Sequence, residues 1–309
     1  MSWQRGFENC VSAGVSLAPL TTFRVGGPAE FFAQPPDAAA LGALLRRAHA
    51  EKIPVHLLGH GTNLLIADAG VSGLVIRLPK SGFANIKRDE ITRGRLTIGA
   101  GHSLPGLVKW SVAQGFSGLE CLQGVPGTVG AALRMNAGGK YGEISARVRR
   151  VSGFEADGSP FHFDARECGF IYRNSALGGR IVMHCDLELQ PGDAAASAKQ
   201  LTAILAEKCK SQPVSARSAG CVFKNPKLPG MPPAGMLIDQ LGLKGFRIGG
   251  ASVSTLHANF LICEKGATAE HLAALIRLIR ARAFNERGVT LELEVETWGF
   301  STHAFSAVA

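Results

Sequence analysis

The chain has 309 residues, of which 46% are hydrophobic and 18% are charged. This length predicts about two domains with buried cores, and this composition excludes a disordered chain or a disulfide-stapled mini-protein. The formal net charge of +9 favours anionic partners without indicating which anion they carry.

Strands and helices are predicted to alternate up to about residue 190. Residues 37–51 are predicted to form an amphipathic helix that begins at the N-cap Asp37 and covers a sheet with its apolar face. Strands are expected at residues 30–33, 55–58, 73–78, 96–98, 148–154 and 181–189. This succession, without a visible repeat, indicates an α+β or α/β architecture.

A domain boundary is predicted at residues 191–193, where Pro-Gly-Asp interrupts the pattern. A second helix is expected at residues 194–209, ending before Pro213. Beyond it we expect a strand at 258–263, a long helix at 268–287 and an alternating strand at 289–297. The sequence therefore predicts a region of residues 1–192 followed by a smaller α+β domain of residues 193–309.

The cysteines, the basic residues and the N-terminus narrow the class of protein. Seven cysteines without a C-x-x-C pair indicate reduced thiols in a cytosol, and no metal site can be recognised. The basic residues are scattered and only 16 Phe and 2 Tyr could stack on bases, so phosphorylated small molecules are favoured over nucleic acid. Arg5 and Glu8 lie where a signal peptide needs an apolar core, and no apolar run approaches the ~20 residues of a membrane span. We therefore expect a cytoplasmic protein without membrane insertion.

The first glycine-rich segment, Gly59 to Leu65, follows the strand predicted at residues 55–58. Its glycines would let backbone N–H groups approach a phosphate, and Thr62 and Asn63 could add side-chain hydrogen bonds. The spacing matches neither the dinucleotide fingerprint nor the P-loop. A plain tight turn is therefore an equal alternative to a phosphate-binding loop.

The second glycine-rich segment covers residues 118–132 and 135–139. Glycine recurs at positions 124, 127 and 130, and Pro126 stiffens the turn, so a backbone surface is available to a flat or phosphorylated ligand. The small residues from Gly130 to Ala132 would equally suit close packing of a helix against a sheet.

Eight short segments occur in an order and spacing that resemble one known family. From Thr21 to Glu296 they are TTFRVGGPA, GHGTNLL, GLECLQGVPGTVGAA, MNAG, YRNS, SAGCVFKNP, HANF and LELEVE. Each segment is weak alone, but eight in sequence are highly specific, and the likeness runs from about Leu17 to Gly299. The chain is therefore similar to the UDP-N-acetylenolpyruvoylglucosamine reductases, or UDP-N-acetylmuramate dehydrogenases, of bacterial peptidoglycan precursor synthesis.

The resemblance implies a fold, a reaction and a cofactor site. The fold is an FAD-binding region of the vanillyl-alcohol oxidase (PCMH) type followed by a substrate-binding domain. In the reaction, NADPH gives a hydride to FAD, and reduced flavin passes it to the enolpyruvyl group of the UDP-sugar. The residues implied to hold FAD are Arg24, Gly26, Gly27, Gly59, His60, Gly61, Thr62, Asn63, Leu64, Gly124, Val125, Pro126, Gly127, Thr128, Gly130, Ala131, Asn136, Ala137 and Gly138.

Hydride addition to an enol ether conjugated to a carboxylate needs donors for the developing negative charge and an acid that protonates carbon. Arg173, in YRNS, matches the family arginine, and its planar charged fork suits that carboxylate, with a surface ion pair as the plain alternative. Glu294 matches the family glutamate. Alternation places Glu292, Glu294 and Glu296 on one strand face, so the residues alone cannot choose among them.

One position departs from the family pattern. Where many members have a proton-donating serine, this chain has Cys221, in SAGCVFKNP. A thiol has an ordinary pKa of about 8.5 and can also protonate carbon. Three readings stay open at this stage: Cys221 donates the proton, Ser218 replaces it, or Cys221 is an inert buried thiol.

The resemblance also implies side chains that bind the substrate, namely Tyr172, Lys224, Asn225, His257 and Asn259. Lys224 and Asn225 would suit the diphosphate or the sugar, and the alternatives are a turn charge and an Asx turn. A single histidine entering an apolar strand, such as His257, is more often structural. The stretch from Arg173 to Cys221 is too short for the substrate-covering insert of one family branch, which favours the shorter branch.

Two other classes of function fit parts of the pattern. An FAD-dependent oxidase of the same superfold would act on an alcohol or hydroxy acid, but it would not require Arg173, Cys221 and Lys224 together. A non-catalytic nucleotide-binding regulator would keep the glycine-rich turns but would have no use for a proton donor.

Overall fold

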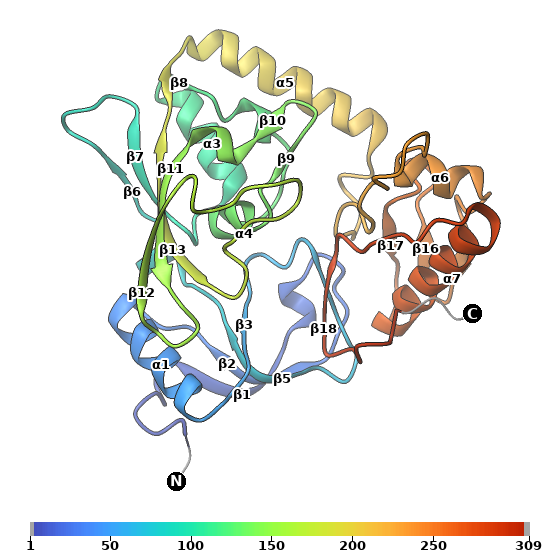
Figure 1. Cartoon of the computed structure of the whole chain (residues 1–309), viewed down its shortest axis with the longest axis horizontal. Helices are drawn as coiled ribbons and strands as arrows, with labels where there is room; N and C mark the ends of the chain where they lie inside the picture. Colours follow the sequence, from blue (N-terminus) through green and yellow to red (C-terminus); the bar gives the residue numbers. More distant parts are fainter. Residues whose placement is uncertain (1–2, 306–309) are drawn as a thin grey trace. The chain divides into compact units, whose positions relative to one another are not determined.

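The computed structural model describes residues 3–305 and is shown in Figure 1. These residues form two compact units that alternate along the chain. The first unit comprises residues 3–13, 31–60 and 73–207, and the second comprises residues 14–30, 61–72 and 208–305. Each unit is built from three separate segments, so these units do not test a single boundary after residue 192, which stays a prediction.

A four-stranded sheet and one helix open the fold. The sheet has the order β1-β2-β5-β3, with β1 at Val11–Ser16, β2 at Pro28–Ala33, β5 at Val71–Ile76 and β3 at Val55–Leu57. Helix α1 spans Ala38–Ala50, and the carboxylate of Asp37 accepts a hydrogen bond from the N–H of Ala40 at 2.8 Å. The apolar face of α1 is fully buried, which confirms the predicted helix: Leu41, Leu44, Leu45 and Ala48.

A five-stranded antiparallel sheet belongs to the first unit (Figure 1). Its order is β12-β11-β13-β7-β6, with β12 at Pro160–Asp164, β11 at Val148–Phe154, β13 at Ile181–Glu188, β7 at Arg95–Gly99 and β6 at Ile86–Arg88. Three of the predicted strands, β11, β13 and β7, are confirmed. Alternate residues such as Val151 and Cys185 are fully buried and share a core with Leu107 of α3 (Leu104–Ala113) and Leu133 of α4 (Val129–Arg134).

Short elements complete the first unit, and α5 continues from it into the second. They are α2 (Lys80–Phe83), β8 (Phe116–Ser117), η2 (Glu120–Leu122), β9 (Gly138–Gly139), β10 (Gly142–Glu143), η3 (Ile144–Arg147), β14 (Gln190–Pro191) and α5 (Ala194–Ser211). The helix expected at residues 194–209 is therefore confirmed, and it ends two residues before Pro213.

The second unit contains the three-stranded sheet β15-β16-β17 and two helices. Its elements are η1 (Ala18–Leu20), β4 (Leu64–Ile66), α6 (Ala234–Gln240), β15 (Arg247–Ile248), β16 (Ala251–Val253), β17 (Leu261–Cys263), α7 (Ala269–Arg287) and β18 (Glu296–Trp298). Thr268 caps α7 by accepting from the N–H of His271, and Leu272, Leu275 and Ile276 are buried. These contacts confirm the long predicted helix. Strand β18 pairs with β4 in parallel.

Two predicted strands are shorter than expected. Only residues 296 and 297 of the stretch 289–297 lie in a strand, which continues to Trp298, and only 261–263 of the stretch 258–263 form a strand. The missing parts make isolated bridges, Leu293 with Phe223 and Phe260 with Cys221, in place of a continuous ladder. An alternating pattern thus marks which residues are buried, but not whether a neighbouring strand runs alongside them.

Within residues 3–305, no helix combines the length and the apolar character needed to cross a bilayer. In the same range, His, Cys, Asp and Glu side chains form no group of three or more that could hold a metal ion. All seven cysteines are free thiols, and burial raises the pKa of Cys168 to about 11.

A buried carboxylate joins α5 to the η2 turn in the first unit. Glu120 is 6% exposed, and it accepts hydrogen bonds from the hydroxyl of Ser197 and the N–H of Gly118, both at 2.6 Å. Burial acts to raise the pKa of Glu120, but these two hydrogen bonds and the charge of Arg147 outweigh it and lower that pKa below its ordinary value. The ionised carboxylate therefore stabilises the fold.

We expect Glu120→Gln to lower the free energy of unfolding by about 1–3 kcal/mol at pH 7, because a charge-assisted buried hydrogen bond is lost. The folded pKa lies below the unfolded one, so the wild-type contribution is present above the unfolded pKa and disappears as the pH falls through the folded pKa. The difference in free energy of unfolding between wild type and Glu120→Gln should therefore become smaller below about pH 4. Urea denaturation at several pH values measures it.

The control is Glu286→Gln, which removes an exposed helix glutamate that pairs with Arg282. Such a surface pair contributes about 0.5 kcal/mol or less. Equal losses in the two variants at neutral pH would contradict a structural role for Glu120.

Candidate active site

The candidate residues fall into two groups, one in each unit. In the first unit, the turn after β3 lies against the N-terminus of α4. A Cβ added at Gly59 would lie 3.0 Å from Oγ1 of Thr128 and 3.6 Å from the Cβ of Ala131. Thr128 is the N-cap of α4, and its hydroxyl accepts from the N–H of Ala131 at 3.3 Å. Two glycine-rich segments that are far apart in the sequence are thus in contact.

The N–H groups of these turns show where an anion could bind. The first N–H groups of α4 are already used, since Val129 donates to His102 O and Gly130 to Ala100 O, both at 2.9 Å. By contrast, within the described chain no acceptor faces the main-chain N–H groups of Gly59, His60, Gly124 and Gly127. Main-chain donors in such turns bind phosphate well. These residues therefore fit the FAD diphosphate through the turns, not through the helix end.

His60 lies in this turn near two cationic side chains, Arg77 and Lys80. Burial lowers the pKa of His60, and the nearby charges of Arg77 and Lys80 act in the same direction, while a backbone hydrogen bond with Gly127 opposes them. The imidazole is therefore neutral at neutral pH, and the two cationic side chains supply the positive charge near the turn.

Other predicted cofactor residues of the first unit have packing roles. A Cβ at Gly130 would lie 3.0 Å from that of Ala100, which supports the helix-packing alternative at this position. Asn136 is 1% exposed, and its Nδ2 donates to the carboxylate of Glu143 at 2.7 Å and to Ile171 O at 3.2 Å. Gly124, Pro126 and Ala131 are exposed, while Val125, Ala137 and Gly138 are half-buried.

Tyr172 and Arg173 form the tip of a tight turn in the first unit. The N–H of Ile171 donates to Asn174 O at 3.0 Å, and the N–H of Asn174 donates back to Ile171 O at 3.1 Å. Arg173 has a φ of +55°, and its guanidinium lies 5.1 Å from the ring centroid of Tyr172. The aromatic ring and the turn together orient this arginine.

In the second unit, the segment TTFRVGG lies beside residues 61–63, the last three of GHGTN. The N–H and the hydroxyl of Thr22 both donate to Gly61 O, at 3.0 and 3.2 Å. A Cβ at Gly27 would lie 2.3 Å from Asp68 O, so only glycine allows this approach of two main chains. Gly26 packs in the same way against Ile66 of β4. The exposed Arg24 donates from Nη1 to Pro19 O at 2.9 Å.

The GHGTN segment also holds the LELEVE segment. Nδ2 of Asn63 donates to Glu294 O at 2.9 Å, and the N–H of Glu296 donates to Asn63 O at 3.1 Å. The pairing continues with Leu64 opposite Glu296 in the β4–β18 ladder. Thr62 is half-buried beside Asn63. Asn63 therefore has a positioning contact to the candidate glutamate.

The segment that carries Cys221 is hydrogen-bonded to the main chain at Glu294. Val222 O accepts from the N–H of Glu294 at 2.8 Å, and the N–H of Val222 donates to Asn259 O at 2.9 Å. The segment around Cys221 thus lies between HANF and LELEVE. Of the three glutamates that the sequence could not separate, Glu292 is exposed and pairs with Lys224 at 3.5 Å.

Three of the expected substrate-binding side chains form contacts within the protein. Asn259 is 3% exposed; its Oδ1 accepts from the N–H of Phe223 at 2.9 Å, and its Nδ2 donates to Phe223 O at 2.8 Å. Asn225 Oδ1 accepts from the N–H of Ala234 at the start of α6. His257 Nδ1 accepts from the N–H of Asn259, and burial lowers the pKa of His257.

Ser218 and Cys221 differ in their surroundings. The hydroxyl of Ser218 is buried and has no hydrogen-bond partner among residues 3–305. The thiol of Cys221 is half-buried and lies on the segment that contacts Glu294. The choice of proton donor stays a prediction.

We expect Asn259→Leu to destabilise the protein strongly, because the buried N–H and C=O of Phe223 lose their partners at a cost of about 1–3 kcal/mol each. The stability of Asn259→Asp should lie between those of wild type and Asn259→Leu, since the carboxylate still accepts from Phe223 N–H but repels Phe223 O. Thermal and urea unfolding measure the order. Asn225→Leu is the matched control, because it removes one part-buried hydrogen bond where Asn259→Leu removes two buried ones; a larger loss there than at Asn259 would contradict this assignment.

Comparisons with known proteins give two family matches along the chain. A family model described as "FAD binding domain" matches residues 29–164, and one described as "UDP-N-acetylenolpyruvoylglucosamine reductase, C-terminal domain" matches residues 212–298. The chain is 42% identical over 283 residues to the UDP-N-acetylenolpyruvoylglucosamine reductase of Heliobacterium modesticaldum, covering 91% of this chain and 88% of that protein. It is 43% identical over 302 residues to that of an Anaeromyxobacter species, covering 96% and 92%.

A solved structure gives the same result at the level of the fold. The crystal structure of UDP-N-acetylenolpyruvylglucosamine reductase from Thermus caldophilus superposes with a TM-score of 0.79 and 38% identity, over 93% of this chain and 98% of that one. The order of the two family matches confirms the expected fold class, an FAD-binding region of the PCMH type followed by an α+β C-terminal domain.

Proposed function

Because the chain belongs to the UDP-N-acetylenolpyruvoylglucosamine reductase family, we propose that it reduces UDP-N-acetylglucosamine enolpyruvate to UDP-N-acetylmuramate for peptidoglycan synthesis. It is an FAD-dependent oxidoreductase, and NADPH is the hydride donor of its family. Family likeness over more than nine-tenths of the chain is the observation that carries this proposal, and it favours the reductase over the oxidase alternative.

The residues of the chain have to bind, orient and protonate the substrate. Bound FAD supplies the chemistry of hydride transfer from NADPH to the methylene carbon of the enol ether. Negative charge then develops on the neighbouring carbon and on the carboxylate. Catalysis therefore requires a cation at the carboxylate and an acid at the carbon.

Arg173 is proposed to bind the substrate carboxylate. Its guanidinium can form two parallel hydrogen bonds to a carboxylate, and these strengthen as negative charge builds. The stacked ring of Tyr172 and the tight turn limit the conformations open to the side chain, so less entropy is lost on binding. Lys224 is proposed to meet the diphosphate, since its ammonium pairs with the exposed Glu292, which can be displaced.

Cys221 is proposed to protonate the carbon, with Glu294 beside it in the proton network. The hydrogen bond between the Glu294 N–H and Val222 O supports this pairing, because it fixes the main chains next to both side chains. Asn259, His257 and Asn225 are proposed to act by holding this segment rather than by touching substrate. A chain with this spacing belongs to the shorter family branch by the same proposal.

The function is tested by the visible spectrum of the purified protein. We expect a yellow protein whose flavin absorption bleaches under NADPH in the absence of oxygen and returns on adding the UDP-enolpyruvyl sugar. Acid precipitation should release the colour, because FAD is expected to bind non-covalently. An alcohol or hydroxy acid that bleaches the flavin, with no response to the UDP-sugar, would instead indicate an oxidase.

The proton donor is tested by stopped-flow reoxidation of the reduced flavin. Cys221→Ala should keep FAD reducible by NADPH while reoxidation by the UDP-sugar falls about 10²- to 10⁴-fold, the usual contribution of one general acid. Cys221→Ser should retain measurable reoxidation, because a hydroxyl carries a transferable proton. Ser218→Ala is the matched control: if it loses reoxidation and Cys221→Ala does not, the donor is Ser218.

A further inference from the structure

The turn that presents Arg173 belongs to a long loop. Residues 165–180 connect β12 to β13 and contain neither helix nor strand among these described residues. Such a loop keeps one conformation only when specific contacts hold it. The positive φ of Arg173 adds to this need, because a non-glycine residue stays there only where its surroundings enforce it.

Main-chain and core contacts fix the loop on both sides of the Arg173 turn. The hydroxyl of Ser175 donates to Arg134 O at 2.8 Å, directly after the Arg173 turn. The N–H of Ala176 donates to Cys168 O at 2.8 Å, and the side chains of Cys168 and Leu177 are fully buried. The loop therefore has an anchor on each side of its tip.

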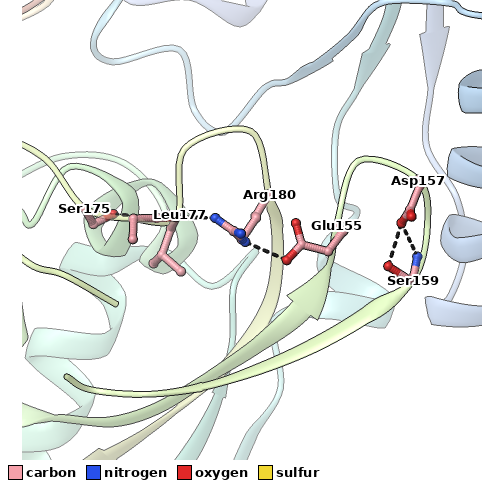
Figure 2. A network of polar contacts seen from close by, with 7 residues as sticks. Glu155, Asp157, Ser159, Ser175, Leu177 and Arg180 are labelled. Carbon is pink, nitrogen blue, oxygen red and sulfur yellow. Dashed lines mark hydrogen bonds and ion pairs between the residues drawn. The ribbon is translucent and has the colours of Figure 1, made fainter. Parts of the chain in front are cut away.

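The end of the loop is held further by one arginine. Arg180 Nε donates to the carboxylate of Glu155 at 2.7 Å, and its Nη1 donates to Ala176 O at 2.5 Å. The guanidinium also lies 4.8 Å from the ring centroid of Phe163 on β12. Figure 2 shows Arg180 between Leu177 of the loop and Glu155. A single side chain thus ties the loop to both strands of the β11–β12 hairpin.

The acceptor of this ion pair is itself held in place. Glu155 follows β11, and its N–H donates to Ser159 O at 2.8 Å. Asp157 accepts from the N–H and the hydroxyl of Ser159 in the same turn, as Figure 2 shows. The side chains of Arg180 and Glu155 are 27% and 34% exposed, so water screens this pair less than a fully exposed one.

We propose that Arg180 is a positioning residue for substrate binding: through Ala176 O, Glu155 and Phe163 it holds the loop that presents Arg173. The inference rests on the proposed function, since it takes Arg173 as the carboxylate-binding group. Sequence reasoning missed Arg180 because it stands outside the motif, just before the predicted strand 181–189.

The test compares the two half-reactions in matched variants. In Arg180→Met, which keeps an unbranched apolar stem but removes the guanidinium, we expect the KM for the UDP-enolpyruvyl sugar in flavin reoxidation to rise about tenfold, as misplacement of a binding group does. Flavin reduction by NADPH should change less than about twofold. Arg180→Lys should rescue part of the effect, and Glu155→Gln should reproduce it in a protein that keeps the arginine.

A double variant separates positioning from general destabilisation. Because Arg180 acts through Arg173, Arg180→Met should add almost nothing to the loss caused by Arg173→Lys. Arg247→Met is the control, since it breaks an exposed ion pair with Glu264 in the second unit and should leave both half-reactions unchanged. The proposal would be overturned if the loss in the double variant equalled the product of the two single losses, or if Arg180→Met slowed both half-reactions equally.

Hydrogen exchange keeps this test independent of the reaction. In Arg180→Met and Glu155→Gln, amides of residues 170–177 should exchange at least about tenfold faster than in wild type, because the loop opens more often. Amides of β13 should be unchanged. Unchanged exchange in the loop would overturn the proposal. Faster loop exchange in a protein that never responds to the UDP-sugar would overturn the proposed function and leave the loop anchor standing.

Discussion

The need to pair buried main-chain groups decides the arrangement of the second unit's candidate residues. Val222 and Phe223 are each 1% exposed, yet the segment from 221 to 224 makes only isolated bridges. Its polar groups must therefore find partners elsewhere. The Asn259 amide takes both groups of Phe223, and the N–H groups of Glu294 and Val295 share Val222 O. In a continuous strand ladder, main-chain groups alone would pair with Val222 and Phe223. Here the side chain of Asn259 takes part of that role, and these hydrogen bonds fix the main chain beside Cys221 and at Glu294.

The same constraint separates glycines that bind from glycines that pack. The N–H groups of the turns at Gly59 and Gly127 point to no acceptor within the described residues, which is what a phosphate requires. Gly27 instead lies so close to another main chain that a Cβ would clash with it. Replacement of Gly27 by alanine would therefore disturb the packing of the protein itself, whether or not a ligand is bound. A glycine-rich motif therefore combines two physical requirements that the letters alone cannot distinguish.

Regular elements could be predicted because their signals are local. The apolar spacing of α1 and α7 and their caps at Asp37 and Thr268 lie within one segment each. Helix α3 was missed because Pro105 and Gly106 at its start resemble a turn, although Ser103 caps it by accepting from the N–H of Gly106. The roles of Asn259 and Arg180 could not be predicted, since their partners lie 36 and 25 positions away and depend on the fold.

A thiol in the proposed donor position changes the protonation balance of the reaction. At neutral pH a thiol with an ordinary pKa of about 8.5 is mostly protonated and can donate without prior activation. Its conjugate base is far less basic than an alkoxide, so proton transfer to carbon is more favourable from Cys221 than from a serine hydroxyl. The thiolate then has to regain a proton before another turnover. That proton comes from water, and a carboxylate in the same proton network, as Glu294 is proposed to be, can take it from water and pass it to the thiolate, which gives the hydrogen bond between the main chains of Val222 and Glu294 a chemical reason.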